Sequence, residues 1–221
     1  GHAVADDDGA DWQVQTITNS IDRSLRRMKT DYLDLIQLHS CGVHVLERGD
    51  AIRALQDARQ AGKVRFIGYS GDNAAARWAI DSGLFDTLQT SYNLVDQHAR
   101  TRLFSHAVRQ GMGIIAKRPV ANAVWGASVS PRRYANAYLD RAQQMLAAGP
   151  IPEAPDNGVL LALGFVLAET AVDVAIVGTR TPEKMEMNIR WLHTALPISN
   201  AAVSALQARF TAVGPNWPQL L

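Results

Sequence analysis

The sequence predicts an α/β fold in which a parallel sheet is covered by helices. Short segments that are apolar at nearly every position alternate with amphipathic helical segments, a pattern typical of parallel strands buried on both faces. Polar or special residues stand at the carboxyl ends of these strands: His39, Ser70, Gln89, Lys117 and Thr179–Arg180. Ligands bind at this edge in a β/α barrel and also in an open doubly wound sheet, so the pattern alone does not choose between them.

The first half of the chain opens with a helix and then alternates between strand and helix. Its apolar stripe, at spacings of three and four, is Val14, Ile17, Ile21, Leu25 and Met28. Strands are predicted at Tyr32–Leu38, which we expect to be buried, and at Val64–Ser70 and Phe85–Tyr92; the helices between them are Asp50–Ala61 and Ala74–Ser82. A glycine follows each of these two helices and is expected to end it.

The second half continues the alternation with one long interruption. The predicted elements are a helix at Thr101–Gln110, a strand at Gly113–Lys117, a helix near Tyr134–Ala148, a helix from about Asp156 to Leu167 and a strand at Val172–Thr179. Asp156 is expected to cap the fourth of these elements. The segment Arg118–Pro155, rich in Pro, Ser and Ala, is otherwise predicted as loop.

Two helices are predicted to close the chain. Thr181, Pro182 and Glu183 suit a helix start, with a capping hydroxyl, Pro in the first turn and an acid near the positive helix end. The side chains expected to face inward from this helix are Met185, Ile189 and Leu192. Ser199 is expected to cap a last helix with Val203, Leu206 and Phe210 on one face.

Composition excludes several classes of protein. The 221 residues hold 22 Lys and Arg against 21 Asp and Glu, which argues against a dedicated nucleic-acid binder. The longest apolar runs, such as Val159–Val166, fall short of the roughly 20 residues that cross a bilayer. No signal-peptide pattern opens the chain, and the single cysteine, Cys41, permits no internal disulfide. We therefore expect a cytoplasmic protein, and the size of the chain, residues 1–221, suits one domain or at most two.

The common catalytic and binding motifs are missing or imperfect. No Gly-x-Gly-x-x-Gly follows a strand, no phosphate loop is present, and the six histidines lack metal-ligand spacing. Ser70 lies in Gly68-Tyr69-Ser70-Gly71-Asp72, which imitates a hydrolase nucleophile elbow except that Asp72 stands where Gly is needed. A hydrolase that uses Ser70 is therefore a minor alternative, and no metal site is expected.

Four segments together resemble the aldo-keto reductase family. They are Tyr32–His39, which starts with Tyr-Leu-Asp-Leu and ends in His; Gly62–Ser70, with Gly-Lys-x-Arg-x-Ile-Gly-x-Ser; Gln89–Asn93; and Val177–Lys184 with Asn188. Each motif alone is weak, but the four agree in order and spacing over nearly the whole chain. The resemblance implies a (β/α)8 barrel that reduces an aldehyde or ketone with NADPH. It also implies that this chain carries strands four to eight, a partial barrel.

The resemblance assigns roles to individual residues. Ser70 and Gln89 match positions that bind the nicotinamide carboxamide, and His39 matches the residue that orients and polarises the substrate carbonyl. Gly178, Thr179, Arg180 and Lys184 match the loop and helix start that hold the 2′-phosphate, and Asn188 matches an adenine contact. A helix start with two cations suits a phosphate dianion.

Two departures from the family pattern affect the expected activity. Lys117-Arg118-Pro119 stands where the family often has an aromatic residue that stacks on the nicotinamide; either this is a variant subfamily, or the two cations meet the cofactor's pyrophosphate. The family's catalytic Asp, Tyr and Lys have no counterparts, and the length falls short of the roughly 250 residues of a β/α barrel. The resemblance thus implies that residues 1–221 form a single, N-terminally incomplete reductase domain.

The missing catalytic Asp, Tyr and Lys affect the activity that we expect of these 221 residues and suggest an alternative function. Without the proton donor we expect inefficient catalysis, since general acid catalysis contributes about 10²–10⁴-fold. Exposed strand edges lead us to expect a poorly behaved or oligomeric chain. The alternative is a non-catalytic NADPH-binding or scaffold protein that retains part of the reductase fold.

Overall fold

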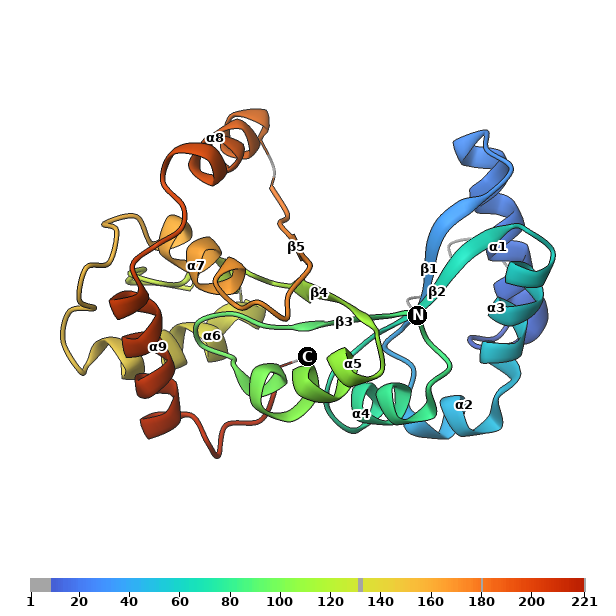
Figure 1. Cartoon of the computed structure of the whole chain (residues 1–221), viewed down its shortest axis with the longest axis horizontal. Helices are drawn as coiled ribbons and strands as arrows, with labels where there is room; N and C mark the ends of the chain where they lie inside the picture. Colours follow the sequence, from blue (N-terminus) through green and yellow to red (C-terminus); the bar gives the residue numbers. More distant parts are fainter. Residues whose placement is uncertain (1–8, 131–132, 180, 221) are drawn as a thin grey trace. The chain divides into compact units, whose positions relative to one another are not determined.

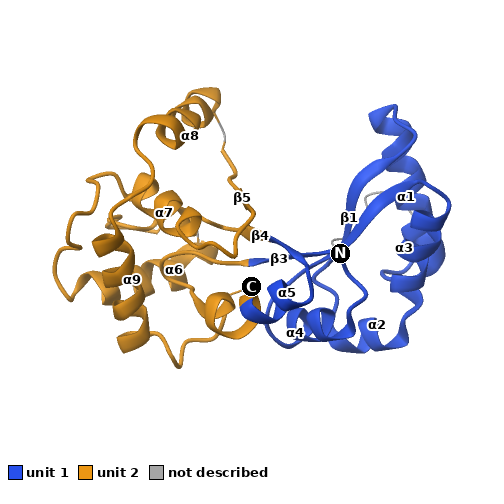
Figure 2. Ribbon diagram, viewed as in Figure 1, with its two compact units in different colours: residues 1–90, 105–114 blue, residues 91–104, 115–221 orange. Residues whose placement is uncertain are grey.

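The computed structural model describes residues 9–130, 133–179 and 181–220. The fold is α/β, and its five strands are hydrogen-bonded in chain order, β1-β2-β3-β4-β5 (Figure 1). The chain forms two compact units, unit 1 with residues 1–90 and 105–114 and unit 2 with residues 91–104 and 115–221 (Figure 2). The predicted α/β class with a parallel sheet is confirmed.

The strands are β1 (Leu33–His39), β2 (Val64–Ser70), β3 (Thr87–Ser91), β4 (Gly113–Lys117) and β5 (Val174–Ile176). The α-helices are α1 (Val14–Met28), α2 (Val43–Arg48), α3 (Asp50–Gln60), α4 (Asn73–Ser82), α5 (Ser105–Arg109), α6 (Asn136–Leu146), α7 (Gly158–Leu167), α8 (Pro182–Thr194) and α9 (Asn200–Val213). A π-helical segment covers Arg100–Phe104, and 3-10 turns cover Ala121–Ala123 and Arg133–Ala135.

Parallel pairing sets the register at the carboxyl ends of the strands. In unit 1, β1 pairs with β2 from Leu33 opposite Val64 to His39 opposite Ser70. β2 pairs with β3 so that Ser70 lies opposite Gln89. In unit 2, β4 pairs with β5. The carboxyl ends of paired strands therefore lie at the same edge of the sheet.

Unit 1 packs helices against β2 and leaves β1 partly uncovered. α1 and α3 lie side by side (Figure 1), and Ile21 and Leu55 of these helices are buried, as is Ile67 of β2. The expectation that Tyr32–Leu38 is a buried strand is wrong, because Tyr32 is 46% exposed and Asp34 is also exposed. Among the described residues β1 has a strand neighbour on one side only, so its side chains meet fewer packing partners.

Unit 2 has a core of aromatic and aliphatic side chains around α7. The ring centroid of Tyr92 lies 5.2 Å from that of Phe104 and 5.5 Å from that of Phe165.

The predicted cap of α7 is wrong by one residue. Asn157, and not Asp156, accepts hydrogen bonds from the main-chain nitrogens of the first turn, at 3.0 and 3.1 Å. Ser199 caps α9 as predicted.

Three further elements differ from the sequence-based expectations. Met185, Ile189 and Leu192 do not face inward; they are 37%, 48% and 46% exposed, and Asn188 is the buried residue of α8. No described residues pack extensively against α8, so the apolar side chains of its amphipathic pattern are not buried. α2 was not predicted, and the helix expected at Thr101–Gln110 is divided into a π-helical segment and α5.

No helix in the described ranges is both long and apolar enough to span a membrane.

Candidate functional site

Three of the predicted site residues meet at one sheet edge in unit 1. His39, Ser70 and Gln89 end or nearly end β1, β2 and β3, and the parallel register places Ser70 opposite both of the others. The pairing continues past the strands, since the main-chain nitrogen of Ser40 donates to the Ser70 carbonyl oxygen at 2.7 Å. Ser70 is buried and His39 is exposed. The register therefore brings these three residues together as the strand-end pattern predicted.

A short hydrogen-bond chain orients the polar groups at this edge. Gln37 Nε2 donates to Gln89 Oε1 at 2.9 Å, and Gln89 Nε2 donates to Ser70 Oγ at 3.1 Å. A hydroxyl carries one proton and two lone pairs. Because Ser70 Oγ accepts from Gln89, its own proton remains to be donated to a ligand.

The same contact argues against nucleophilic chemistry at this edge. A serine nucleophile needs a neighbouring general base, whereas the Ser70 hydroxyl oxygen accepts from the Gln89 amide N–H, which cannot take a proton. Cys41 is no better a candidate, because it is buried and desolvation raises the pKa of its thiol to about 11. Ser70 and Cys41 are thus arranged for hydrogen bonding and packing.

Unit 2 contains a cavity of about 720 Å³. Five predicted cofactor residues line it: Arg118, Gly178, Thr179, Lys184 and Asn188. The other lining residues are Pro119, Val120, Asn122, Ala123, Tyr134, Val159, Ile176, Val177 and Met187. The described lining thus holds two cations and no carboxylate, which favours an anionic ligand.

Arg118 is held on one side by protein oxygens. Its Nη1 donates to the hydroxyl oxygen of Tyr138 and to the carbonyl oxygen of Leu220, each at 3.1 Å. Nη1 carries two protons, and these two bonds use both. Among the described residues, no group accepts a hydrogen bond from the Nε and Nη2 edge, which is the forked edge that binds phosphate oxygens bidentately.

The cavity wall next to Arg118 has unusual backbone geometry. Arg118, Ala121, Asn122 and Ala123 all have left-handed φ values, between 46° and 59°. Non-glycine residues in this region carry strain and concentrate at functional sites. Within the described chain Asn122 Nδ2 is buried without a hydrogen-bond partner, so this wall presents a donor that a ligand acceptor could satisfy.

Two predicted residues are not placed in the cavity. Lys117 ends β4 and is half-buried, but it is not among the residues that line the cavity. Arg180 lies outside the described residues.

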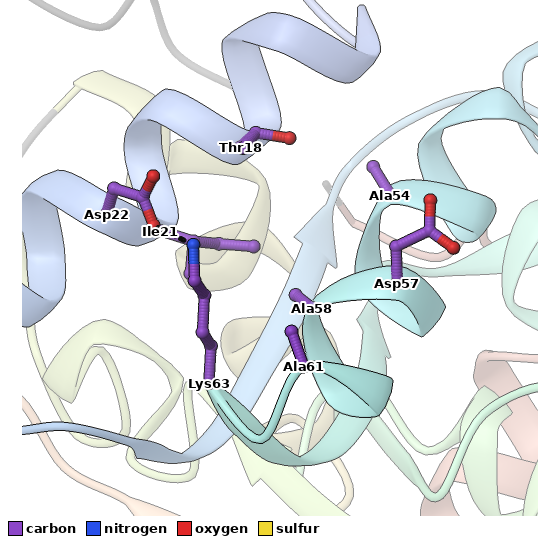
Figure 3. Close-up of a pocket in the computed structure, with 8 residues that line it drawn as sticks. All are labelled: Thr18, Ile21, Asp22, Ala54, Asp57, Ala58, Ala61 and Lys63. Atoms are coloured by element: carbon purple, nitrogen blue, oxygen red, sulfur yellow. Dashed lines mark hydrogen bonds and ion pairs between the residues drawn. The ribbon is translucent and has the colours of Figure 1, made fainter.

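A second, smaller cavity in unit 1 lies between α1 and α3, where no site was predicted (Figure 3). It measures about 200 Å³ and has small apolar side chains such as Ala54 and Ala58 on one wall. Lys63 reaches across its edge to Asp22, with 2.7 Å between Nζ and Oδ1 (Figure 3). The cavity is a packing gap between two helices, closed on one side by an ion pair.

The structure adds three residues that sequence reasoning missed. Gln37 orients Gln89, Tyr138 holds Arg118, and Asn122 offers a buried donor. Gln37 had a detectable signal, because it lies two positions before His39 in a strand and so shares its face. No group of His, Cys, Asp and Glu in the described ranges is arranged to hold a metal ion.

The sequence model of the aldo/keto reductase family matches residues 5–208 of this chain. The chain belongs to the aldo/keto reductase family. The match covers nearly the whole sequence and confirms the family that the strand-end motifs predicted. The two polar groupings above are thus parts of an aldo/keto reductase.

Two characterised dehydrogenases are similar to this chain in sequence, and a solved aldo-keto reductase is similar in fold. L-galactose dehydrogenase from Arabidopsis thaliana is 24% identical, over 82% of this chain and 59% of its own length. Pyridoxal 4-dehydrogenase from Microbacterium luteolum is 23% identical, over 85% of this chain and 60% of its own. The holo form of an aldo-keto reductase from Bacillus halodurans superposes with a TM-score of 0.76 at 22% identity, covering 90% of this chain and 68% of that chain.

The lengths of these proteins bear on the fold. The chain spans about 60% of the two curated relatives, and its five parallel strands are consistent with part of a (β/α)8 barrel. The predicted fold class is thus confirmed.

Proposed function

We propose that this aldo/keto reductase chain binds NADPH and acts in the reduction of a small aldehyde or ketone to an alcohol. The observation that carries the proposal is the cavity in unit 2. It gathers five residues predicted for the cofactor, including two cations, and no carboxylate is among its described lining residues. A dinucleotide phosphate is the kind of ligand that such a lining favours.

Within unit 2, the proposed contacts are those of the nucleotide end of the cofactor. Arg118 would bind the pyrophosphate through its Nε and Nη2 edge. Lys184, Thr179, Gly178 and Arg180 would hold the 2′-phosphate at the start of α8, where main-chain N–H groups and the helix dipole favour an anion. Asn188, one turn after Lys184 and buried, would contact the adenine. The buried Asn122 donor suits an acceptor-rich ligand of this kind.

Within unit 1, the proposed contacts are those of the reacting end. Ser70 would donate its free proton to the nicotinamide carboxamide, and Gln89 would bind the same group. His39 would orient and polarise the substrate carbonyl. When bound, NADPH supplies the hydride that the reduction requires. A cytoplasmic setting is part of the proposal, because the buried thiol of Cys41 requires no oxidising compartment.

The proposal is tested by titrating NADPH and NADH into the chain and following the cofactor fluorescence. Arg180→Glu and Lys184→Glu should weaken NADPH by about 10-fold or more, the value of a charged hydrogen bond, and should weaken NADH much less. Arg190→Glu is the matched control, because it makes the same type of charge change at an exposed position of α8 away from the cavity lining.

The outcomes separate the possibilities. An equal loss of both cofactors in Arg180→Glu and Lys184→Glu would refute their 2′-phosphate role. Binding of NADPH without even the slow aldehyde turnover expected in the absence of the proton donor would favour the alternative of a non-catalytic NADPH-binding or scaffold protein. No binding of either cofactor would overturn the proposal.

A further inference from the structure

The residues Trp217–Leu220, here called the tail segment, are held in unit 2 by side chains from distant parts of the chain. The main-chain nitrogen of Leu220 donates to Asp96 Oδ2 at 2.9 Å, and His98 Nε2 lies 2.5 Å from the Trp217 carbonyl oxygen. Arg141 Nη2 donates to the carbonyl oxygen of Pro218. These contacts act on the main chain, so they determine where the tail segment lies whatever its side chains are.

A buried ion pair anchors this arrangement. The side chains of Arg141 and Asp96 are only 5% and 0% exposed, and Arg141 Nη1 lies 3.9 Å from Asp96 Oδ2. The guanidinium also lies over the Trp217 ring, 5.0 Å from its centroid. A buried charge is costly unless it is paired and hydrogen-bonded. Displacing the tail segment would remove partners from both charges, so the pair resists that displacement.

The anchored tail segment in turn touches the cavity. The Leu220 carbonyl oxygen is one of the two acceptors that bind Arg118 Nη1, and Arg118 lines the cavity. A free arginine side chain loses rotamer entropy when it is immobilised. Holding the guanidinium before the ligand arrives therefore improves affinity by preorganisation.

We propose that the tail segment is a positioning element for the anion-binding cavity. Asp96 and Arg141 hold Leu220 in place, and the Leu220 carbonyl, together with the Tyr138 hydroxyl, turns the Nε and Nη2 edge of Arg118 toward the ligand. The inference rests on the proposed function, in which that ligand is the pyrophosphate of NADPH. It assigns Asp96, Arg141 and Tyr138 as positioning residues that need not touch the cofactor.

The test is a double-mutant cycle in the 221-residue chain, with the NADPH dissociation constant as the measurement. The variants are Arg118→Gln, removal of residues 218–221, and the two changes combined. Each single change should weaken NADPH by about 10-fold, and the combined variant should be no weaker than Arg118→Gln alone, because the tail segment acts through Arg118. Additive losses would overturn the proposal.

A matched control separates positioning from general stability. Arg209 also donates to main-chain carbonyl oxygens within unit 2, at 2.9 Å to Met145 and 2.7 Å to Gly149, and neither residue belongs to the tail segment. Arg209→Met should lower the thermal unfolding midpoint and leave the NADPH dissociation constant unchanged. If the truncated chain does not fold, Leu220→Pro replaces it in the cycle, since it removes the N–H that binds Asp96.

A second measurement keeps the proposal testable if NADPH does not bind at all, which would be a failure of the proposed function. The side-chain N–H signals of Arg118 in a ¹⁵N NMR spectrum should be slowed in exchange with water in the unmodified chain. They should exchange rapidly in the truncated chain or in Leu220→Pro. Unchanged signals would overturn the positioning role independently of any cofactor.

Discussion

Gln89 donates a hydrogen bond to Ser70 across 3.1 Å, between Nε2 and Oγ. Ser70 ends β2, Gln89 lies two residues before the end of the neighbouring parallel strand β3, and the two lie opposite one another in the register. Their bond has a direction because Gln37 donates to the other end of the Gln89 amide, at 2.9 Å. The arrangement leaves the Ser70 proton free for a ligand.

Gln37→Leu should therefore weaken NADPH binding even though no cofactor contact is proposed for Gln37. Without the Gln37 donor, the Gln89 amide is free to rotate and to compete for the Ser70 proton. The expected loss is about 2- to 10-fold, the value of one neutral hydrogen bond. Fluorescence titration of NADPH measures it. Gln60→Leu, at an exposed position of α3, should bind NADPH as the unmodified chain does; equal affinity in both variants would contradict the prediction.

Gly68→Ala should destabilise the chain by about 1–3 kcal/mol, as overpacking in a core does. A Cβ at Gly68 would lie 2.1 Å from Thr87 Oγ1 and 3.1 Å from Gln37 Cγ, on the two neighbouring strands. Urea denaturation measures the change. Gly178→Ala is the control, because nothing lies within 4 Å of its Cβ position. Adding Thr87→Ala to Gly68→Ala should restore part of the stability, and a lack of rescue would mean that the clash is elsewhere.

Tyr92→Phe should leave the chain as stable as before or stabilise it by up to about 1 kcal/mol. The Tyr92 hydroxyl is buried and has no hydrogen-bond partner within the described chain, and burial raises the pKa of this phenol well above its usual range. Tyr69→Phe is the contrasting variant, because Tyr69 donates to the Cys41 carbonyl oxygen at 2.8 Å. It should cost about 1 kcal/mol. Both free energies of unfolding come from denaturant titration, and a larger loss in Tyr92→Phe would contradict the assignment.

Stability should fall as the pH drops below the unfolded-state pKa of His98, 6.5. Desolvation by burial lowers the pKa of His98 in the folded chain, and the positive charge of Arg102 lowers it further. The unfolded state then binds the proton more readily than the folded state, so the contribution is present above pH 6.5 and lost as the pH falls toward the lowered value. Denaturant titration at several pH values should show a shallower pH slope in His98→Gln. The same substitution at the exposed His193, His193→Gln, is the control.

Local patterns in the sequence account for most of the elements. The helical spacing over Val14–Met28 and the apolar run Val64–Ser70 match α1 and β2 as observed, because such patterns report which positions of a single element face the same way. Predictions of burial were less successful. Met185 and Ile189 carry an apolar helical pattern, but burial requires a second surface, and the described residues bring none against them. A pattern within one helix holds no information on its neighbours.

The same distinction between local patterns and long-range contacts applies to the candidate site. The residues Ser70, Gln89, Lys184 and Asn188 are visible in the sequence, because each belongs to one of the four motifs that resemble the family. The contacts that orient the side chains of the site are not visible in the sequence. Gln37 and Gln89 are 52 positions apart, and Arg118 and Leu220 are 102 apart.

Sequence by itself thus determined the family, the alternation of strands and helices and the side chains at the strand ends. Tertiary structure decided which hydrogen bonds orient the Gln89 amide beside Ser70 and which nitrogen of Arg118 is bound by protein oxygens. The physical reason is that a hydrogen bond depends on separations of about 3 Å between specific atoms, and folding creates those separations between segments that no local pattern connects.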